Sequence, residues 1–168
     1  ITSAGISLLN ISTSESRLLY SNTTEDFFQV PSLYYDDQLK RLWIGTGSAG
    51  LFYYDIIRKS LSDIPIRNFP KQPILAIRKD AKNTLLIGID GQGIWNISEK
   101  GDTILHIYKE DLNNPFSLRG DGVYDILCDG SKNWIATFTG KLSFFENNNS
   151  QITPVTYQIN NPNSLGNN

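Results

Sequence analysis

Short apolar runs separated by polar, glycine-containing segments recur along the whole chain. No stretch of ten or more residues carries apolar side chains at the i, i+3, i+4, i+7 spacing of an amphipathic helix. Runs of five or six residues rich in aliphatic and aromatic side chains are typical of β-strands, and the Gly, Asn and Asp residues between them are typical of turns. The pattern therefore predicts an all-β chain.

One apolar motif returns three times. It reads Leu-Trp-Ile-Gly-Thr at 42–46, Leu-Leu-Ile-Gly-Ile at 85–89 and Asn-Trp-Ile-Ala-Thr at 133–137. The small residue within each copy is Gly45, Gly88 or Ala136, so successive copies lie 43 and then 48 residues apart. Self-similarity at a fixed period of roughly 20 to 50 residues indicates a repeat architecture.

Two further motifs accompany each copy in the same order. A glycine or its replacement, an aliphatic residue and a small polar or acidic ending follow each copy, and the same signature opens the chain at 5–10. An apolar pair and an aspartate precede each copy: Ile74, Ile77 and Asp80; Val123, Ile126 and Asp129; and, most divergent, Pro31, Tyr34 and Asp37. We expect Asp80 and Asp129 to cap tight turns by accepting hydrogen bonds from the nearby backbone.

A period of this length with four strand signals is typical of one blade of a β-propeller, a four-stranded antiparallel sheet that must stack on its neighbours. In the last copy the predicted strands are 123–128, 133–138, 142–146 and one near 155–159, from the innermost outwards. Apolar residues on both faces of the inner strands suit a sheet covered on both sides. Gly45, Gly88 and Ala136 are interpreted as small residues that let the adjacent blade approach closely.

The repeat register predicts fourteen strands, or about three and a half blades. The predicted units are a half blade at 1–30, blades at 31–72 and 73–120, and a blade plus linker at 121–168. The half blade has no two inner strands at the other end of the chain to complete it, which disfavours a closed four-bladed ring. The exposed strand edges and blade faces would be prone to associate with other chains. We therefore expect a partial propeller: a fragment of a larger ring, or a half ring that forms a seven-bladed homodimer.

The repeat resembles the two-component regulator propeller repeat, whose units are separated by a Pro-x-Ser-Leu linker like that at 114–118. Residues 43–55 follow the family pattern closely, whereas Leu86, Ala136 and Lys141 depart from it. The resemblance implies the extracytoplasmic, periplasmic sensor region of a membrane-bound hybrid histidine kinase that responds to carbohydrate. It implies that this segment is a non-catalytic part of the parent sensor kinase.

Composition narrows the classes of partner. Lys and Arg number 15 against 17 Asp and Glu, for a net charge of −2, which disfavours a nucleic-acid partner. The longest uninterrupted apolar stretch, 49–54, is far shorter than the about 20 residues that cross a bilayer, so no membrane contact by this segment is expected. Cys128 is the single cysteine, which excludes an internal disulfide.

Three features could carry chemistry, but each has a simpler interpretation. His106 lies in a predicted outer strand with no second metal ligand or nucleophile in the pattern around it. Cys128 ends a predicted inner strand, where free thiols usually pack. The segment 90–93 lacks the Gly-x-x-x-x-Gly-Lys phosphate loop and the calcium-loop spacing, and is interpreted as a hairpin turn. We predict no catalytic residue, no metal site and no cofactor.

Ligands of propellers are expected on the face where the turns between the second and third strands meet the linkers between blades. On this register that face carries Asp90, Gln92, Phe116, Arg119, Asp121 and Phe138, with Lys71 and Gln72 from another linker. Aromatic rings, carboxylates, amides and a guanidinium suit an oligosaccharide or a peptide. A ligand-sensing segment is the leading hypothesis, and a protein-interaction scaffold and, less favoured, a propeller lyase or hydrolase are the alternatives, which the fold alone does not separate.

Overall fold

The computed structural model describes residues 5–21, 29–138, 141–156, 158, 161 and 164. All regular elements within these residues are β-strands. They are β1 (Gly5–Leu9), β2 (Ser16–Ser21), β3 (Ser32–Asp36), β4 (Arg41–Gly45), β5 (Leu51–Asp55), β6 (Ser60–Asp63), β7 (Ile74–Lys79), β8 (Leu85–Ile89), β9 (Gly93–Ile97), β10 (Ile104–Tyr108), β11 (Val123–Cys128), β12 (Lys132–Thr137), β13 (Leu142–Glu146) and β14 (Thr153–Val155).

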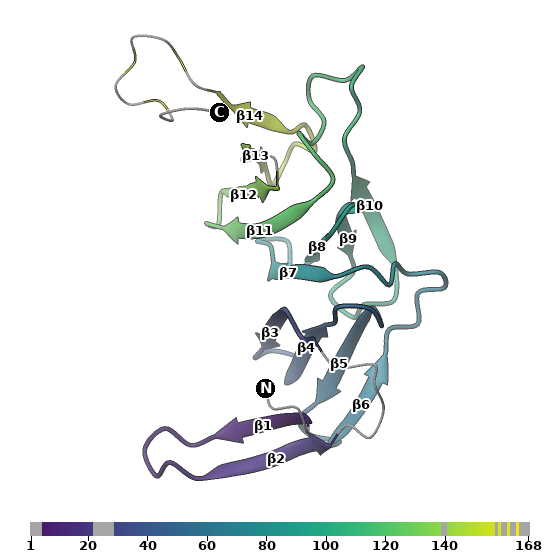
Figure 1. Cartoon of the computed structure of the whole chain (residues 1–168), viewed down its shortest axis with the longest axis vertical. Helices are drawn as coiled ribbons and strands as arrows, with labels where there is room; N and C mark the ends of the chain where they lie inside the picture. Colours follow the sequence, from purple (N-terminus) through teal and green to yellow (C-terminus); the bar gives the residue numbers. More distant parts are fainter. Residues whose placement is uncertain are drawn as a thin grey trace.

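The strands form three four-stranded antiparallel sheets and one two-stranded sheet. The four-stranded sheets run β3-β4-β5-β6, β7-β8-β9-β10 and β11-β12-β13-β14, and β1 pairs with β2. Figure 1 shows the sheets following one another along the longest axis of the molecule, from β1–β2 to β11–β14. The prediction of three and a half propeller blades is confirmed.

The strand bounds of the last blade agree with the pattern except at its outer edge. β11 and β13 have the predicted bounds, and β12 begins and ends one residue earlier than predicted. The outermost strand is 153–155 rather than 155–159, because Thr153 pairs with Phe144 and Val155 with Leu142. Residues 157 and 159 of the predicted strand, and most of residues 160–168, lie outside the described residues.

An aspartate closes the first turn of each full blade, and in the first blade it is Asp36 rather than Asp37. Oδ1 of Asp36 accepts hydrogen bonds from the backbone N–H groups of Gln38 and Leu39 at 3.0 and 3.1 Å. Asp80 and Asp129 accept equivalent bonds, as predicted. The pattern misplaced the first aspartate because β7 and β11 each contain a bulge near their start, which adds a residue. β3 pairs in unbroken register.

Both faces of the inner strand β4 are covered, as expected between stacked blades. Ile44 and Trp43 are neighbours on β4, point to opposite faces and are both fully buried. Ile44 packs with Ile6 of β1, whereas Trp43 packs with Ile74 and Ile87 of the next blade. A third apolar cluster joins β7–β10 to β11–β14. Burial between sheets therefore stabilises this fold.

Two glycines permit the close approach of neighbouring blades. A Cβ atom added at Gly45 would lie 2.6 Å from Cγ2 of Ile74, and one added at Gly88 would lie 2.9 Å from Cγ1 of Val123. Both distances are shorter than any ordinary carbon contact. Each glycine therefore faces the first residue of the innermost strand of the following blade, which confirms the interpretation of these two glycines.

Candidate functional site

Turns and linkers meet at one end of the blades, where the ligand face was predicted. The backbone N–H of Asp90 donates to the carbonyl of Pro73 at 2.9 Å, and that of Phe138 donates to the carbonyl of Gly122 at 2.7 Å. The N–H of Gly93 donates to the carbonyl of Asp121 at 2.9 Å. These bonds fix each turn between the second and third strands against the linker that precedes an innermost strand.

An exposed aromatic pair lies at this end of the last blade. The rings of Tyr124 and Phe138 have centroids 5.5 Å apart, and the residues are 51% and 70% exposed. Gly122 lies beside them: a Cβ atom added there would be 3.2 Å from Cβ of Phe138 and 3.4 Å from Oδ1 of Asp90. Phe138 and the Asp90 carboxylate, which come from adjacent blades, therefore both lie beside Gly122.

Tyr124 was missed in the sequence because it lies inside an apolar inner-strand pattern. The pairing of β11 with β12 shifts between Val123 and Asp125, so Tyr124 lies at a bulge and is half exposed. A bulge interrupts the alternation of side chains along a strand. The only available signal was an aromatic residue where the previous blade has Leu75.

Two predicted residues make polar contacts within the linker between the second and third blades. Nζ of Lys109 donates to Oε1 of Gln92 at 3.1 Å. Oδ1 of Asp121 accepts a hydrogen bond from the N–H of Glu110 at 2.6 Å. The carboxylate of Asp121 thus orders the linker. Lys109 binds the oxygen of the Gln92 amide and so orients the NH2 group of that amide.

Phe116 lies at the outer edge of the last blade, whereas the carbonyl of Arg119 accepts a hydrogen bond from Oγ1 of Thr137 at the end of β12. The carbonyl of Phe116 accepts a hydrogen bond from the N–H of Ile152, which immediately precedes the outermost strand β14. Nη2 of Arg119 donates to the carbonyl of Pro115 at 2.9 Å. The structure therefore brings Asp90 and Phe138 together but places Phe116 at the opposite edge of the sheet from the innermost strand β11.

Lys71, from the preceding linker, lines a different hollow. A groove of about 540 Å³ lies beside β5 and the linker 64–73. Its lining includes Phe52, Asp63, Phe69 and Lys71. The sequence pattern grouped Lys71 with the ligand-face residues of other linkers, and the structure shows that it lines this groove.

The remaining candidates occupy the positions that the simpler interpretations predict. Residues 90–93 form the turn between β8 and β9, with Gly91 and Gly93 at φ values of +66° and +74°. His106 is exposed on the outer strand β10, and its ring packs 4.4 Å from that of Tyr108. Burial, followed by the charge of Asp80, raises the pKa of Cys128 to about 11.

Within the described ranges, no three or more His, Cys, Asp or Glu side chains gather where they could hold a metal ion. The same residues include no helix long and apolar enough to span a membrane.

No family model and no curated protein matches the chain. Solved structures do match it. The extracellular domain of BT3049 from B. thetaiotaomicron, described as a hybrid two component system, is 23% identical with a TM-score of 0.65, over 98% of this chain and 20% of that one. The extracellular domain of BT4673 from the same organism, described as a one component system, is 19% identical with a TM-score of 0.62, over 94% of this chain and 20% of that one. A chain of the mitotic checkpoint complex is 12% identical with a TM-score of 0.64, over 96% of this chain and 45% of that one.

These likenesses establish the fold. The chain spans about a fifth of the length of the two bacterial domains that it matches. Both are extracellular domains of signalling proteins, so the resemblance inferred from the repeat is confirmed at the level of fold. A chain of the mitotic checkpoint complex has a similar fold, which means that the function must be argued from the site.

Proposed function

We propose that the chain is a ligand-sensing segment of an extracytoplasmic, periplasmic β-propeller within a membrane-bound hybrid two-component histidine kinase, and that its ligand is a carbohydrate. The observation that carries the proposal is the exposed pair of Tyr124 and Phe138 beside the Asp90 carboxylate. Exposed aromatic rings at the inner end of a blade contribute little to the stability of the sheet. They offer flat apolar faces on which the C–H face of a sugar ring can stack.

The polar groups around this pair suit sugar hydroxyls. The carboxylate of Asp90 accepts hydrogen bonds from hydroxyl groups, and the amide of Gln92 both donates and accepts them. Arg119 and Asp121 hold the linker that carries the surface. The segment binds and does not catalyse, and its effect on the kinase is a shift between two arrangements of paired sensors that differ in ligand affinity.

Calorimetry tests this function. The protein is titrated with neutral hexasaccharides of glucose, xylose and mannose and with an acidic chondroitin tetrasaccharide. We expect one of these probes to bind, and Phe138→Ala or Tyr124→Ala to weaken binding by roughly tenfold, as expected for the loss of one stacked ring. Phe116→Ala is the matched control, because Phe116 is similarly exposed but lies beside the outermost strand.

The alternatives predict different results. A scaffold that binds proteins would show no heat with any sugar, even within a closed ring. A lyase or hydrolase would turn over a probe and would lose that turnover in Asp90→Asn. A homodimer that completes a seven-bladed ring is one route to closure, and the rest of the parent protein is the other; a single 18.9 kDa species in light scattering excludes the dimer.

A further inference from the structure

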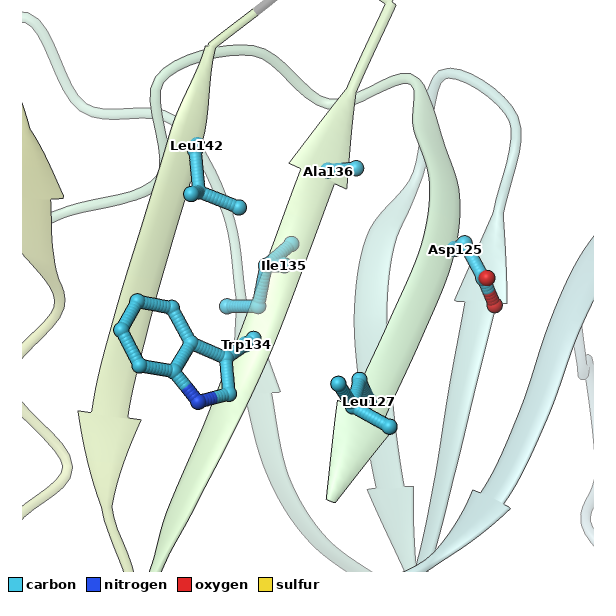
Figure 2. A pocket seen from close by; sticks show the side chains of 6 residues that line it. All are labelled: Asp125, Leu127, Trp134, Ile135, Ala136 and Leu142. Carbon is cyan, nitrogen blue, oxygen red and sulfur yellow. The ribbon is translucent and has the colours of Figure 1, made fainter. Parts of the chain in front are cut away.

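The outward face of the last blade is apolar and open to solvent. It surrounds a hollow of about 270 Å³, and Figure 2 shows the side chains that line it. The lining residues are Asp125, Leu127, Trp134, Ile135, Ala136 and Leu142. Leu127 is 61% exposed, which is unusual for an aliphatic residue on an inner strand.

The strand register shows which face of the first blade corresponds to this open face. Ala136 pairs with Leu142 as Gly45 pairs with Leu51 in the first blade, so Trp134 occupies the position of Trp43. At the interface between the first two complete blades, Trp43 and Leu51 are 0% and 3% exposed, because the sheet β7–β10 covers them. The open face is therefore the same surface as an interface that already exists within the chain.

Two positions on this face differ from the covered one. Where the first blade has Gly45, the last has Ala136, whose methyl group stands in the space that Ile74 enters at the first interface. Where the first blade has Ser32, whose hydroxyl donates to the carbonyl of Ile74 at 2.6 Å, the last has Asp125. The Asp125 carboxylate instead accepts a hydrogen bond from Nη2 of Arg78 at 2.8 Å, and in Figure 2 it points away from β12.

We propose that this face docks one further four-stranded blade of the same repeat, and that the innermost strand of that blade places a residue smaller than valine over Ala136. The proposal rests on the part of the proposed function that makes this chain one segment of a larger protein. Continuity with the interface between β3–β6 and β7–β10 supports it, as does the match of the chain to only a fifth of the bacterial domains. Isoleucine or valine, which fill this place at the internal interfaces, would overlap the methyl group of Ala136.

A second copy of the chain is a poorer occupant. At the internal interface the covering residues come mainly from the two innermost strands of the next blade, Ile74 and Ile77 of β7 and Ile87 and Ile89 of β8. In the described residues, the sheet at the other end of the chain has only β1 and β2. Because a two-stranded sheet has no strand equivalent to β7, it would leave the surface around Ala136 uncovered, where Ile74 of β7 packs against Gly45 in the first blade.

Acrylamide quenching of Trp134 tests the docking. The indole fluorescence is measured in the 168-residue chain and in the chain extended through the next repeat of its own gene, and the Trp134→Phe variant of each is subtracted. We expect the quenching constant to fall at least threefold on extension. Unchanged quenching in the extended chain overturns the proposal. So does a 168-residue chain that sediments as a dimer and already protects Trp134, since a second copy then covers the face.

Two substitutions identify the face itself. Leu127→Asp in the extended chain is expected to restore quenching of Trp134, while Ile57→Asp, at a position that is also exposed but lies in the first blade, leaves it protected. Circular dichroism of both variants in the 168-residue chain, where both side chains face solvent, shows that neither change prevents folding. Equal effects of the two changes contradict docking at this face.

The size requirement has its own test. Isoleucine substituted at the covering position of the extended chain is expected to expose Trp134, and Ala136→Gly in the same protein is expected to protect it again. If isoleucine is accommodated without loss of protection, the size requirement is wrong. None of these measurements depends on sugar binding, so a sensor that binds no oligosaccharide leaves this inference intact.

Discussion

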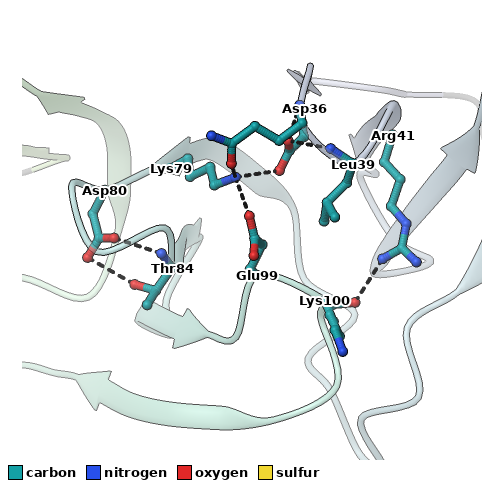
Figure 3. A network of polar contacts seen from close by, with 9 residues as sticks. Asp36, Leu39, Arg41, Lys79, Asp80, Thr84, Glu99 and Lys100 are labelled. Atoms are coloured by element: carbon teal, nitrogen blue, oxygen red, sulfur yellow. Dashed lines mark hydrogen bonds and ion pairs between the residues drawn. The ribbon is translucent and has the colours of Figure 1, made fainter.

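The ammonium group of Lys79 lies 3.0 Å from the carboxylate of Asp36 in the neighbouring blade. Their side chains are 9% and 1% exposed, and the ammonium also bonds to Glu99 at 2.6 Å and to Gln38 at 2.9 Å. Figure 3 shows Asp36 from one blade and Lys79 and Glu99 from the next converging on one point. Burial alone lowers the pKa of Lys79, but the hydrogen bonds to Glu99 and Asp36 outweigh it, and the pKa of Lys79 is raised.

Replacing this lysine tests how much the inter-blade ion pair stabilises the stack. Lys79→Met leaves the Asp36 carboxylate buried without its cation, so we expect a loss of about 3 kcal/mol in the free energy of unfolding by urea. Lys82→Met is the matched control, because Lys82 is exposed, and it should change the free energy by less than about 0.5 kcal/mol. Similar values for the two variants would mean that the pair contributes nothing.

Gly45→Ala tests the close approach of the first two complete blades. The added methyl group would overlap Oγ of Ser32 in the same sheet and lie 2.6 Å from Cγ2 of Ile74 in the next one, so both side chains must shift, and we expect a loss of about 2 kcal/mol in thermal or urea unfolding. Ala136→Gly is the reciprocal change on the open face and should cost about 1 kcal/mol or less, chiefly through chain entropy. A stable Gly45→Ala protein would show that the interface is adaptable.

Asp129 makes the free energy of unfolding depend on pH in the acidic range. Hydrogen bonds from the backbone N–H of Lys132, from Trp134 and from Ser131 hold the pKa of the Asp129 carboxyl well below its usual range. A lowered pKa stabilises the fold above the unfolded value near 3.8, and this stabilisation is lost as the pH falls towards the folded value. The urea midpoint should therefore fall below about pH 4, and it should fall less steeply in Asp129→Asn. Parallel pH profiles would contradict this role.

Gly122→Ala separates ligand binding from stability at the proposed site. The new methyl group would contact Cβ of Phe138 at 3.2 Å and Oδ1 of Asp90 at 3.4 Å, which displaces the ring but lies at the surface. We expect roughly tenfold weaker binding of whichever oligosaccharide the protein binds, measured by calorimetry, with less than about 1 kcal/mol lost in unfolding. Binding that is unaffected would place the sugar elsewhere.

Cys128 should react slowly with thiol reagents while the protein is folded. With its pKa raised from 9.0 to about 11, the thiolate fraction at pH 8 falls about 100-fold, and the thiolate is the reactive form. We expect labelling by a disulfide reagent, followed by absorbance, to be slower by about this factor in buffer than in urea. Equal rates in buffer and urea would indicate a reactive thiol at the end of β11.

Local patterns predicted the blades well, because strand alternation and turn chemistry act over a few residues. The period around Gly45, Gly88 and Ala136 predicted the sheets, and the glycines of 90–93 predicted their turn. The same reasoning assigned Asp37, in place of Asp36, to the first copy of the motif and overlooked Tyr124. Both errors have one cause: a β-bulge is present in β7 and β11 but not in β3, and a single extra residue changes which side chains face out.

Hydrophobic periodicity and turn residues are local properties, and they suffice to predict that this chain is a row of short antiparallel sheets. The side chains that meet between sheets are apparent only in the folded chain. Lys79 and Asp36 lie 43 residues apart, and Phe138 and Asp90 contact the same space from different blades. Such contacts depend on bulges, on rotamers and on how closely small residues let the blades approach, and no local pattern encodes these.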